Sequence, residues 1–192
     1  MKSDIEKFLY QNIKSPEKIL GVFEELLEYS ELEAYDYFTK SGETPCDFII
    51  MKSGIIRSYF LNEDGREITR AFFTPGYISG ATSAMMQRTK SEVNYQALTK
   101  VTGYKGNFFE LKELIAKHHE LSSLYVKTLE DAYLKAENVI FDISTNSATE
   151  RYLLLKERIP KIDNLITQKH IASYLNVSPV QLSRKRKKLL FG

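Results

Sequence analysis

Residues 167–190, TQKHIASYLNVSPVQLSRKRKKLL, decide how the chain is to be interpreted. Apolar side chains at helical spacing form two short faces in this stretch: Ile171, Ala172 and Leu175, then Leu182, Leu189 and Leu190. Between the two faces, Ser178 is a residue type that caps helix N-termini, and Pro179 follows at the first helical position, where its missing N–H costs nothing. Ala172 is small enough to let two helices cross closely. The stretch therefore predicts two short helices joined by a tight turn.

The second predicted helix is basic and rich in hydrogen-bond donors. Its polar residues are Ser178, Gln181, Arg184, Lys185, Arg186, Lys187 and Lys188. Such a helix can enter a major groove of DNA, because its cations neutralise phosphates while its amide and guanidinium groups reach base edges. A basic run alone is typical of a solvated tail, but a solvated tail needs neither a marked helix start nor a small residue at a crossing. The pattern therefore favours a helix-turn-helix that binds double-stranded DNA.

One pattern in this stretch is distinctive: Thr167-Gln168-x-x-Ile171-Ala172-x-x-Leu175-x-Val177-Ser178-Pro179-x-x-Leu182-Ser183-Arg184-x-Arg186-Lys187-x-Leu189. It resembles the helix-turn-helix of the Crp/Fnr superfamily of bacterial transcription regulators, in particular short members without a β-hairpin wing after the recognition helix. The resemblance implies sequence-specific DNA binding, with RNA polymerase as a further candidate partner. We expect base-edge contacts from Ser178, Gln181 and Arg184, with Arg184 bidentate to guanine. We expect phosphate contacts from Thr167, Gln168, Lys169, Lys185, Arg186 and Lys188.

The distribution of charge separates the end of the chain from the rest. The net charge of the 192 residues is +2, but the segment from Arg151 onward holds ten basic residues against two acidic ones and carries +8. The remainder carries −6, so only the end is suited to a polyanion. No apolar run reaches the roughly 20 residues of a membrane span, and the acidic first residues do not fit a signal peptide. We therefore expect a cytoplasmic protein without a membrane partner.

The first half of the chain predicts short helices followed by many short strands. Helical spacing covers residues 4–12 and 16–29, and β-type runs separated by turn formers cover 32–39, 47–52, 55–61, 67–73, 92–98 and 101–107. The sequence Asn62-Glu63-Asp64-Gly65 between two such runs indicates a hairpin. We therefore predict an α+β chain whose strands form an antiparallel β-roll. The family resemblance implies a jelly-roll-like domain of the cyclic-nucleotide-binding type.

The resemblance also directs attention to residues 75–97, where the family binds phosphate. The effector-binding candidates in this segment are Gly80, Ala81, Thr82, Ser83, Ser91 and Glu92. In the family a glutamate and an arginine hold the ribose and the phosphate, whereas here Ala81 and Ser91 fall at those positions, with Glu92 beside the second. A cyclic phosphate would meet an acid and no matching base, so we expect no response to cAMP. A polar ligand on the backbone around Thr82, or simply a capped helix over a core containing Met85 and Met86, remain the two interpretations.

From residue 108 onward the pattern is helical. A series of small and apolar residues repeats every three or four positions: Leu121, Tyr125, Thr128, Ala132, Ala136, Val139 and Ile143. A long helix with a narrow apolar seam is typical of pairing with a copy of itself, and two recognition helices suit a palindromic operator. Residues 144–147 then break the helix and offer N-caps for another at 148–158. We therefore divide the chain into a sensor-like roll at 1–118, a dimerisation helix at 119–144 and a DNA-binding domain at 145–192.

The sequence gives no indication of a cofactor, a metal site or catalysis. The three histidines, His118, His119 and His170, lack zinc-site spacing, and Cys46 is the only cysteine. No P-loop, dinucleotide fingerprint or nucleophile elbow occurs. We therefore predict a transcription regulator and not an enzyme. The alternative is a ligand sensor whose basic end contacts an acidic protein partner.

Overall fold

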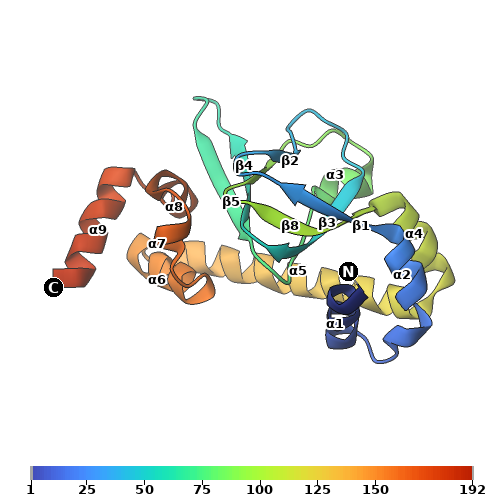
Figure 1. The fold of residues 1–192 in the computed structure, drawn as a ribbon. Helices are drawn as coiled ribbons and strands as arrows, with labels where there is room; N and C mark the ends of the chain where they lie inside the picture. The colour runs from blue at the N-terminus through green and yellow to red at the C-terminus, as the bar shows by residue number, and fades with distance from the viewer. Residues whose placement is uncertain (1, 192) are drawn as a thin grey trace.

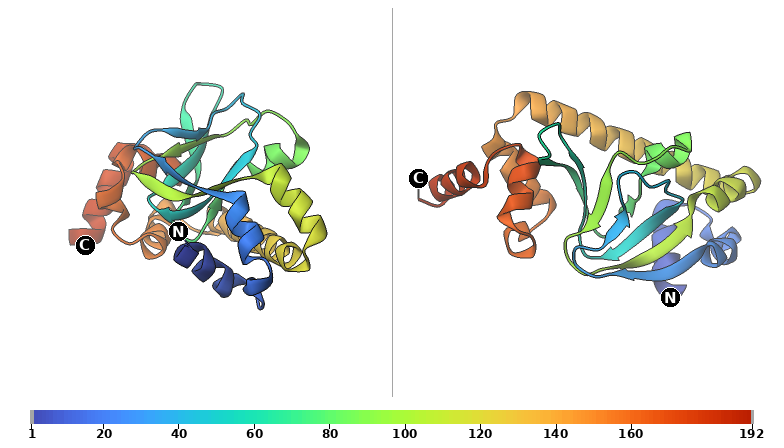
Figure 2. Two further views of the ribbon diagram at one scale, coloured as in Figure 1. Left: turned by 45° about the vertical axis from the view of Figure 1, so that its right-hand side comes forward. Right: turned by 90° about the horizontal axis from the view of Figure 1, so that it is seen from above.

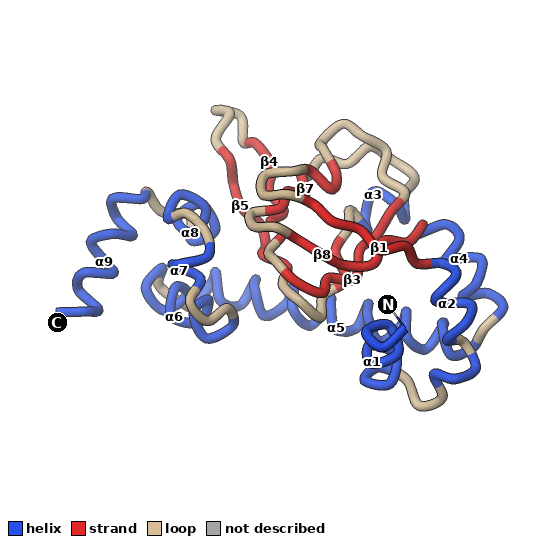
Figure 3. The backbone as a smooth tube through the Cα atoms, in the orientation of Figure 1, coloured by secondary structure: helices blue, strands red, loops and turns tan. Residues whose placement is uncertain are grey.

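The computed structural model describes residues 2–191, which fold into a β-roll flanked by helices (Figures 1 and 3). The helices are α1 (Lys2–Asn12), η1 (Pro16–Lys18), α2 (Leu20–Leu26), α3 (Thr82–Gln87), α4 (Phe108–Lys117), α5 (His119–Thr145), α6 (Ala148–Arg158), α7 (Ile162–Leu165), α8 (Gln168–Leu175) and α9 (Pro179–Phe191). The strands are β1 (Leu27–Leu32), β2 (Tyr37–Thr39), β3 (Asp47–Ser53), β4 (Ile56–Leu61), β5 (Glu67–Phe73), β6 (Ile78–Ser79), β7 (Asn94–Ala97) and β8 (Val101–Asn107). The predicted fold class is confirmed.

The strands form two four-stranded antiparallel sheets. Their orders are β1-β8-β3-β6 and β2-β7-β4-β5. A buried apolar cluster between the sheets takes Ile49 and Val101 from the first sheet and Ile56 and Tyr95 from the second. Because each strand alternates its side chains between two faces, the inward residues of both sheets meet in this cluster. β5 is an edge strand of the second sheet.

The β4–β5 hairpin was predicted from its turn and is confirmed. Asn62 accepts a backbone hydrogen bond of 2.9 Å from Gly65, and its side chain accepts one of 2.8 Å from the Arg66 N–H. Gly65 has φ 73°, a left-handed conformation that glycine adopts without a steric penalty. The turn therefore closes the hairpin and presents Arg66 at its end.

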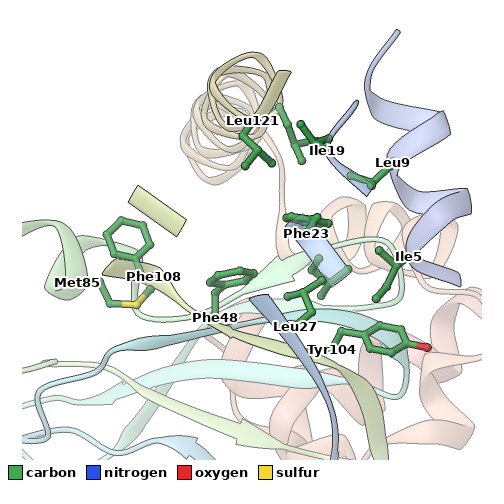
Figure 4. Close-up of a cluster of buried hydrophobic side chains, with 12 residues drawn as sticks. Ile5, Leu9, Ile19, Phe23, Leu27, Phe48, Met85, Tyr104, Phe108 and Leu121 are labelled. Carbon is green, nitrogen blue, oxygen red and sulfur yellow. The ribbon is translucent and has the colours of Figure 1, made fainter. Parts of the chain in front are cut away.

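The N-terminal helices and the first turns of α5 cover one end of the roll. Figure 4 shows their buried side chains together with those of the strands beneath, including Leu9, Phe23, Phe48, Phe108 and Leu121. Each of these five side chains is at most 5% exposed. Burying apolar groups of this size stabilises the packed arrangement by roughly 1.5–3 kcal/mol each. The cluster thus fixes the base of α5 on the roll.

From that base α5 runs past the roll, and α6 to α9 gather at its far end (Figure 2). The N-cap of α6 is Ser147, within the predicted capping segment 144–147, and it forms a capping box with Glu150. The end of α5 therefore carries the helices of the predicted DNA-binding domain. No helix within residues 2–191 has the length and apolar character needed to cross a bilayer.

Two secondary-structure predictions were wrong near the start of the roll. The helix expected at 16–29 ends at Leu26, because Leu27 pairs with Gly106 in a β1–β8 ladder. The single strand expected at 32–39 is split into β1 and β2 around Tyr35, whose φ is 75°. Short apolar segments suit a helix and a strand equally, so pairing with a distant strand decided the outcome. The two-residue strand β6 was not predicted.

Candidate nucleic-acid interface

The turn between α8 and α9 is fixed by backbone geometry and by a reciprocal cap. Asn176 ends α8 in the left-handed conformation with φ 54°, and the N–H of Val177 donates to the carbonyl oxygen of Ala172 at 3.0 Å. The Ser178 hydroxyl accepts from the N–H of Gln181 at 3.2 Å, while the Gln181 side chain accepts from the N–H of Ser178 at 2.8 Å. The predicted helix start is confirmed, and it is a capping box.

The inner faces of the two helices belong to one apolar cluster with α6 and α7. Ile171, Leu175 and Leu182 have no exposed surface, and Ala172 is 1% exposed, as its predicted place at the crossing requires. Leu189 was expected on the same inner face but is 44% exposed, so this part of the prediction was wrong. The side chain of Leu190 lies outside the described residues. A single fully buried leucine therefore anchors α9 among the described side chains.

The outer face of α9 is polar and open. Gln181, Arg184 and Lys188 are exposed, and Ser178 is half-buried at the start of the helix. A shallow groove of about 430 Å³ lies between the start of α8 and α9, lined by Gln168, Pro179, Val180, Ser183, Arg184 and Lys187. Two residues of this groove are joined by a hydrogen bond of 3.1 Å, which Gln168 Nε2 donates to the carbonyl oxygen of Pro179. Of the three residues expected at base edges, Arg184 lines this groove.

Three of the cations expected at phosphates have partners inside the chain. Lys169 Nζ lies 3.6 Å from a carboxylate oxygen of Glu67, although its side chain remains 68% exposed. Lys185 Nζ donates to the hydroxyl of Thr149 on α6 at 3.3 Å, and Arg186 Nη1 lies 3.4 Å from Asp163 on α7. Lys185 and Arg186 therefore face the helices behind α9. The exposed residues Thr167, Lys187 and Lys188 make no such contact with the described part of the chain.

The effector-binding candidates in the roll divide into buried and exposed residues. Gly80, Ala81 and Ser91 are buried, and the Ser91 hydroxyl is occupied by the backbone of Val93, to which it donates at 2.7 Å. Thr82, Ser83 and Glu92 are exposed. Ala81 is the N-cap of α3 and makes no side-chain cap, so the expected hydroxyl cap is wrong. The expected core pair is also split, because Met85 is buried whereas Met86 is 46% exposed.

Apolar and aromatic side chains fill the space between the two sheets near this segment. Ala81 packs in the same cluster as Tyr95 and Val101, and Phe73 lies with its ring centre 5.9 Å from that of Tyr95. The Tyr95 hydroxyl accepts from Arg70 at 3.2 Å. The guanidinium of Arg88 lies over the ring of Phe109, 4.9 Å from its centre. Arg70 and Arg88 are therefore engaged with aromatic residues.

The long helix α5 is mostly exposed beyond its first turns. Only Leu121 and Leu124 of its described residues are buried, and both pack under the N-terminal helices. The predicted seam was therefore wrong in its first turns, since Leu121 faces the roll. A stripe with heptad spacing remains accessible beyond these turns: Val126, Leu129, Tyr133, Ala136, Ile140 and Ile143, of which Leu129 is half-buried; Leu134 and Phe141 are exposed beside it. Tyr133 is 63% exposed and Ile140 is 66% exposed, which is unusual for side chains of this size.

A polar network that the sequence did not reveal connects the roll to α8. The side chain of Arg57 is 3% exposed and donates to Glu67 at 2.8 Å and to Gln96 at 2.7 Å. Burial alone would raise the pKa of Glu67, but the hydrogen bond from Arg57 and the nearby positive charges of Arg57 and Lys169 together lower it. His170 of α8 is 7% exposed; burial, together with the Arg57 charge, lowers its pKa to about 4. No motif marks these residues, because β4, β5, β7 and α8 meet only in the folded chain.

We compared the chain with protein-family models, curated sequences and solved structures. Residues 29–118 match the family model for the cyclic nucleotide-binding domain. No curated protein sequence matches the chain. The structure of FixK2 from Bradyrhizobium japonicum is similar over 85% of this chain and 84% of its own, with a TM-score of 0.72 and 17% identity.

Two further structures are similar over most of their length. The c-di-GMP responsive global regulator CLP from Xanthomonas campestris is matched over 91% of both chains, with a TM-score of 0.70 and 15% identity. A chain from Eubacterium rectale assigned to the crp/fnr family of transcriptional regulators is matched over 95% of this chain and 86% of its own, with a TM-score of 0.71 and 16% identity. Residues 29–118 therefore match the model of the cyclic nucleotide-binding domain, and the chain has the fold of these three structures.

Proposed function

We propose that the chain is a sequence-specific DNA-binding transcription regulator that acts as a homodimer in the cytoplasm. The observation that carries the proposal is the outer face of α9, where Gln181, Arg184 and Lys188 stand exposed on a helix whose start is capped and whose inner face is buried. A rigidly held helix with donors along one face can place them at base edges in a major groove. The proposal includes no catalytic activity.

The proposed DNA contacts fall into two groups, those to base edges and those to phosphates. Arg184 lines the groove beside α8 and carries two parallel donors, so we assign it to a guanine edge, with Gln181 and Ser178 at neighbouring bases. Thr167, Gln168, Lys169 and Lys188 are assigned to phosphates. Lys185 and Arg186 would first have to leave Thr149 and Asp163, so their contribution to phosphate binding should be smaller.

The proposed division of labour follows the three segments. Residues 1–118 form the sensor-like roll, 119–144 pair two copies, and 145–192 bind DNA. The exposed heptad face of α5 supports pairing, because an apolar stripe of this length in water is stabilised by a second copy. Two copies would present two α9 helices to a palindromic site.

We propose further that cAMP is not the signal. Ala81 is buried in the apolar cluster of the roll, and the hydroxyl of Ser91 is bonded to backbone, so neither the ribose nor the phosphate would find its usual partner. Placing an unpartnered phosphate beside Glu92 would cost free energy. Calorimetry with cAMP and cGMP should give no heat of binding, and saturable heat with either would contradict this part of the proposal.

A titration of the full chain with random duplex DNA at two salt concentrations tests the proposed function. Binding that weakens steeply as salt increases is expected, because phosphate contacts release counterions. Selection from a randomised duplex pool should then yield a site with two-fold symmetry. A protein that binds no duplex at low salt but captures an acidic protein partner would instead support the sensor whose output is a protein contact.

A further inference from the structure

The edge strand β5 has α8 in the place of a further strand. An edge strand leaves backbone N–H and carbonyl groups without partners. Here the hydroxyl of Ser173 accepts from the N–H of Thr69 at 2.9 Å and donates to the carbonyl oxygen of Glu67 at 2.8 Å. Ser173 is 8% exposed and Thr69 is 4% exposed, so both bonds are removed from water. One hydroxyl therefore fastens α8 to the sheet.

Apolar packing closes the same junction. The ring centres of Phe72 on β5 and Tyr174 on α8 lie 5.2 Å apart. Ile55 and Leu98 of the roll belong to the buried cluster that contains Leu182 of α9. Part of the core of the helix-turn-helix is thus supplied by the roll, so separating the two would expose apolar surface on both.

A third set of contacts surrounds this junction. Glu67 joins the buried Arg57 to Lys169 of α8, and Arg66 donates to the carbonyl oxygen of Val177 at 3.4 Å. The turn that contains Val177 leads directly into α9. The β4–β5 hairpin therefore touches the helix-turn-helix both at α8 and at the turn before the recognition helix.

The helix-turn-helix has one face that packs against the roll and another face that stays open. Ser173 and Tyr174 face the roll, whereas the groove beside Gln168 and Arg184 stays open. Gln168 ties α8 to the first residue of α9, and Arg151 of α6 donates to the carbonyl oxygen of Leu175 at 2.9 Å. The position of α8 on β5 therefore sets the position of α9 relative to the roll and to α5.

We infer that Ser173 is a positioning residue. Its hydroxyl takes the hydrogen bonds that a further strand would make with the edge strand β5, and it so holds the recognition helix α9 in the orientation that binds DNA. The inference rests on the proposed function. A helix-turn-helix released from β5 keeps its own contacts with DNA but samples many orientations, so the fraction of protein that can span two half-sites falls. Through Glu67 and Arg66, a change in the β4–β5 hairpin would reach α9 by the same route.

The test uses the full chain and the variant Ser173→Ala. Ser123→Ala is a matched control, because the Ser123 hydroxyl bonds only to His119 in its own helix, far from the junction. Hydrogen exchange at the Thr69 amide reads out the junction directly, and we expect exchange at least about tenfold faster in Ser173→Ala than in the unmodified chain or the control. If undocking leaves roughly a tenth of the molecules competent, apparent affinity for the selected two-fold site falls about tenfold, while random duplex is bound as before.

Arg66→Ala provides a second, exposed variant in case Ser173→Ala fails to fold. It removes a hydrogen bond between the hairpin and Val177 without opening the core, and the same selective loss of affinity, about twofold to threefold, is expected. Unchanged Thr69 exchange in Ser173→Ala, or faster exchange with undiminished affinity for the two-fold site, overturns the inference. An unmodified chain that binds no duplex overturns the proposed function, and with it the DNA-positioning role, while Thr69 exchange still shows whether Ser173 fastens α8.

Discussion

The side chain of Gln168 donates a hydrogen bond of 3.1 Å to the carbonyl oxygen of Pro179 and so joins the first residue of α8 to the first residue of α9. The same side chain lines the groove that Arg184 lines, and its phosphate contact stays a prediction. Both helices begin at this bond, so the N-terminus of α8 lies beside that of α9. Anions are favoured at such ends.

Replacing Arg184 should weaken the selected site more than random DNA. Arg184→Ala removes a bidentate donor pair, so we expect a loss of roughly 1–3 kcal/mol at the preferred site and relaxed base preference at one position. Competition binding against single-base variants of the site measures this. Arg88→Ala, which removes an arginine stacked on Phe109 of the roll, is the control and should bind as the unmodified chain does. Equal losses on specific and random duplexes would make Arg184 a phosphate contact.

Replacing Lys185 and replacing Lys188 in α9 should change the salt dependence of DNA affinity by different amounts. Lys188 is exposed, whereas Lys185 Nζ is bonded to Thr149. Lys188→Ala should reduce the slope of log affinity against log salt by about one, because one phosphate contact is lost, and Lys185→Ala should change it less. Titrations of random duplex at four salt concentrations give both slopes. Equal slopes for Lys185→Ala and Lys188→Ala would mean that Lys185 leaves Thr149 for DNA.

The helix-turn-helix was largely predictable because its signals are local. Ser178, Pro179 and Ala172 act within a few residues, and the capping and crossing that they predict depend only on their own side chains and the nearby backbone. The hairpin at Asn62 was predictable for the same reason. Local signals therefore located the two helices and the turn that form the candidate interface.

The junction with the roll was not predictable, because its parts are distant in sequence. Ser173 is 104 residues from Thr69, and nothing in the α8 sequence distinguishes a serine that bonds an edge strand from one that faces water. The partners of Lys185 and Arg186 were missed similarly, since a basic run does not show which of its members meet Thr149 and Asp163. Tertiary contacts decide these roles.

A charge placed on the exposed face of α5 should prevent dimerisation. Ile140→Glu puts a carboxylate into the apolar stripe, and in a dimer it would face a copy of itself without a partner. Sedimentation velocity should show a monomer, and affinity for a two-fold site should fall by about a hundredfold or more, because the second half-site contact is lost. Tyr10→Glu is the control, since Tyr10 is 59% exposed on α1, outside the stripe. A dimeric Ile140→Glu protein would place the interface elsewhere.

Stability should fall in mildly acidic solution because of His170. Burial, reinforced by the charge of Arg57, lowers the pKa of His170 from 6.5 to about 4, so the folded chain keeps this imidazole neutral while the unfolded chain takes up a proton. Between pH 6.5 and about 4 the unfolded state therefore binds more protons, and the free energy of unfolding decreases as pH falls. The full loss is at most about 3 kcal/mol, since each pKa unit corresponds to about 1.4 kcal/mol.

Urea unfolding of the unmodified chain and of His170→Asn from pH 8 to pH 4 isolates this contribution. The carboxylates are shared by both proteins, so the difference between the two curves reports His170. Above pH 7 the difference should be constant, because the imidazole is then neutral in both states. Below pH 6.5 the curves should converge, since the variant has no imidazole to protonate and the unmodified chain loses stability. Parallel curves down to pH 4 would mean that His170 accepts its proton in the folded chain, which would require it to leave the neighbourhood of Arg57.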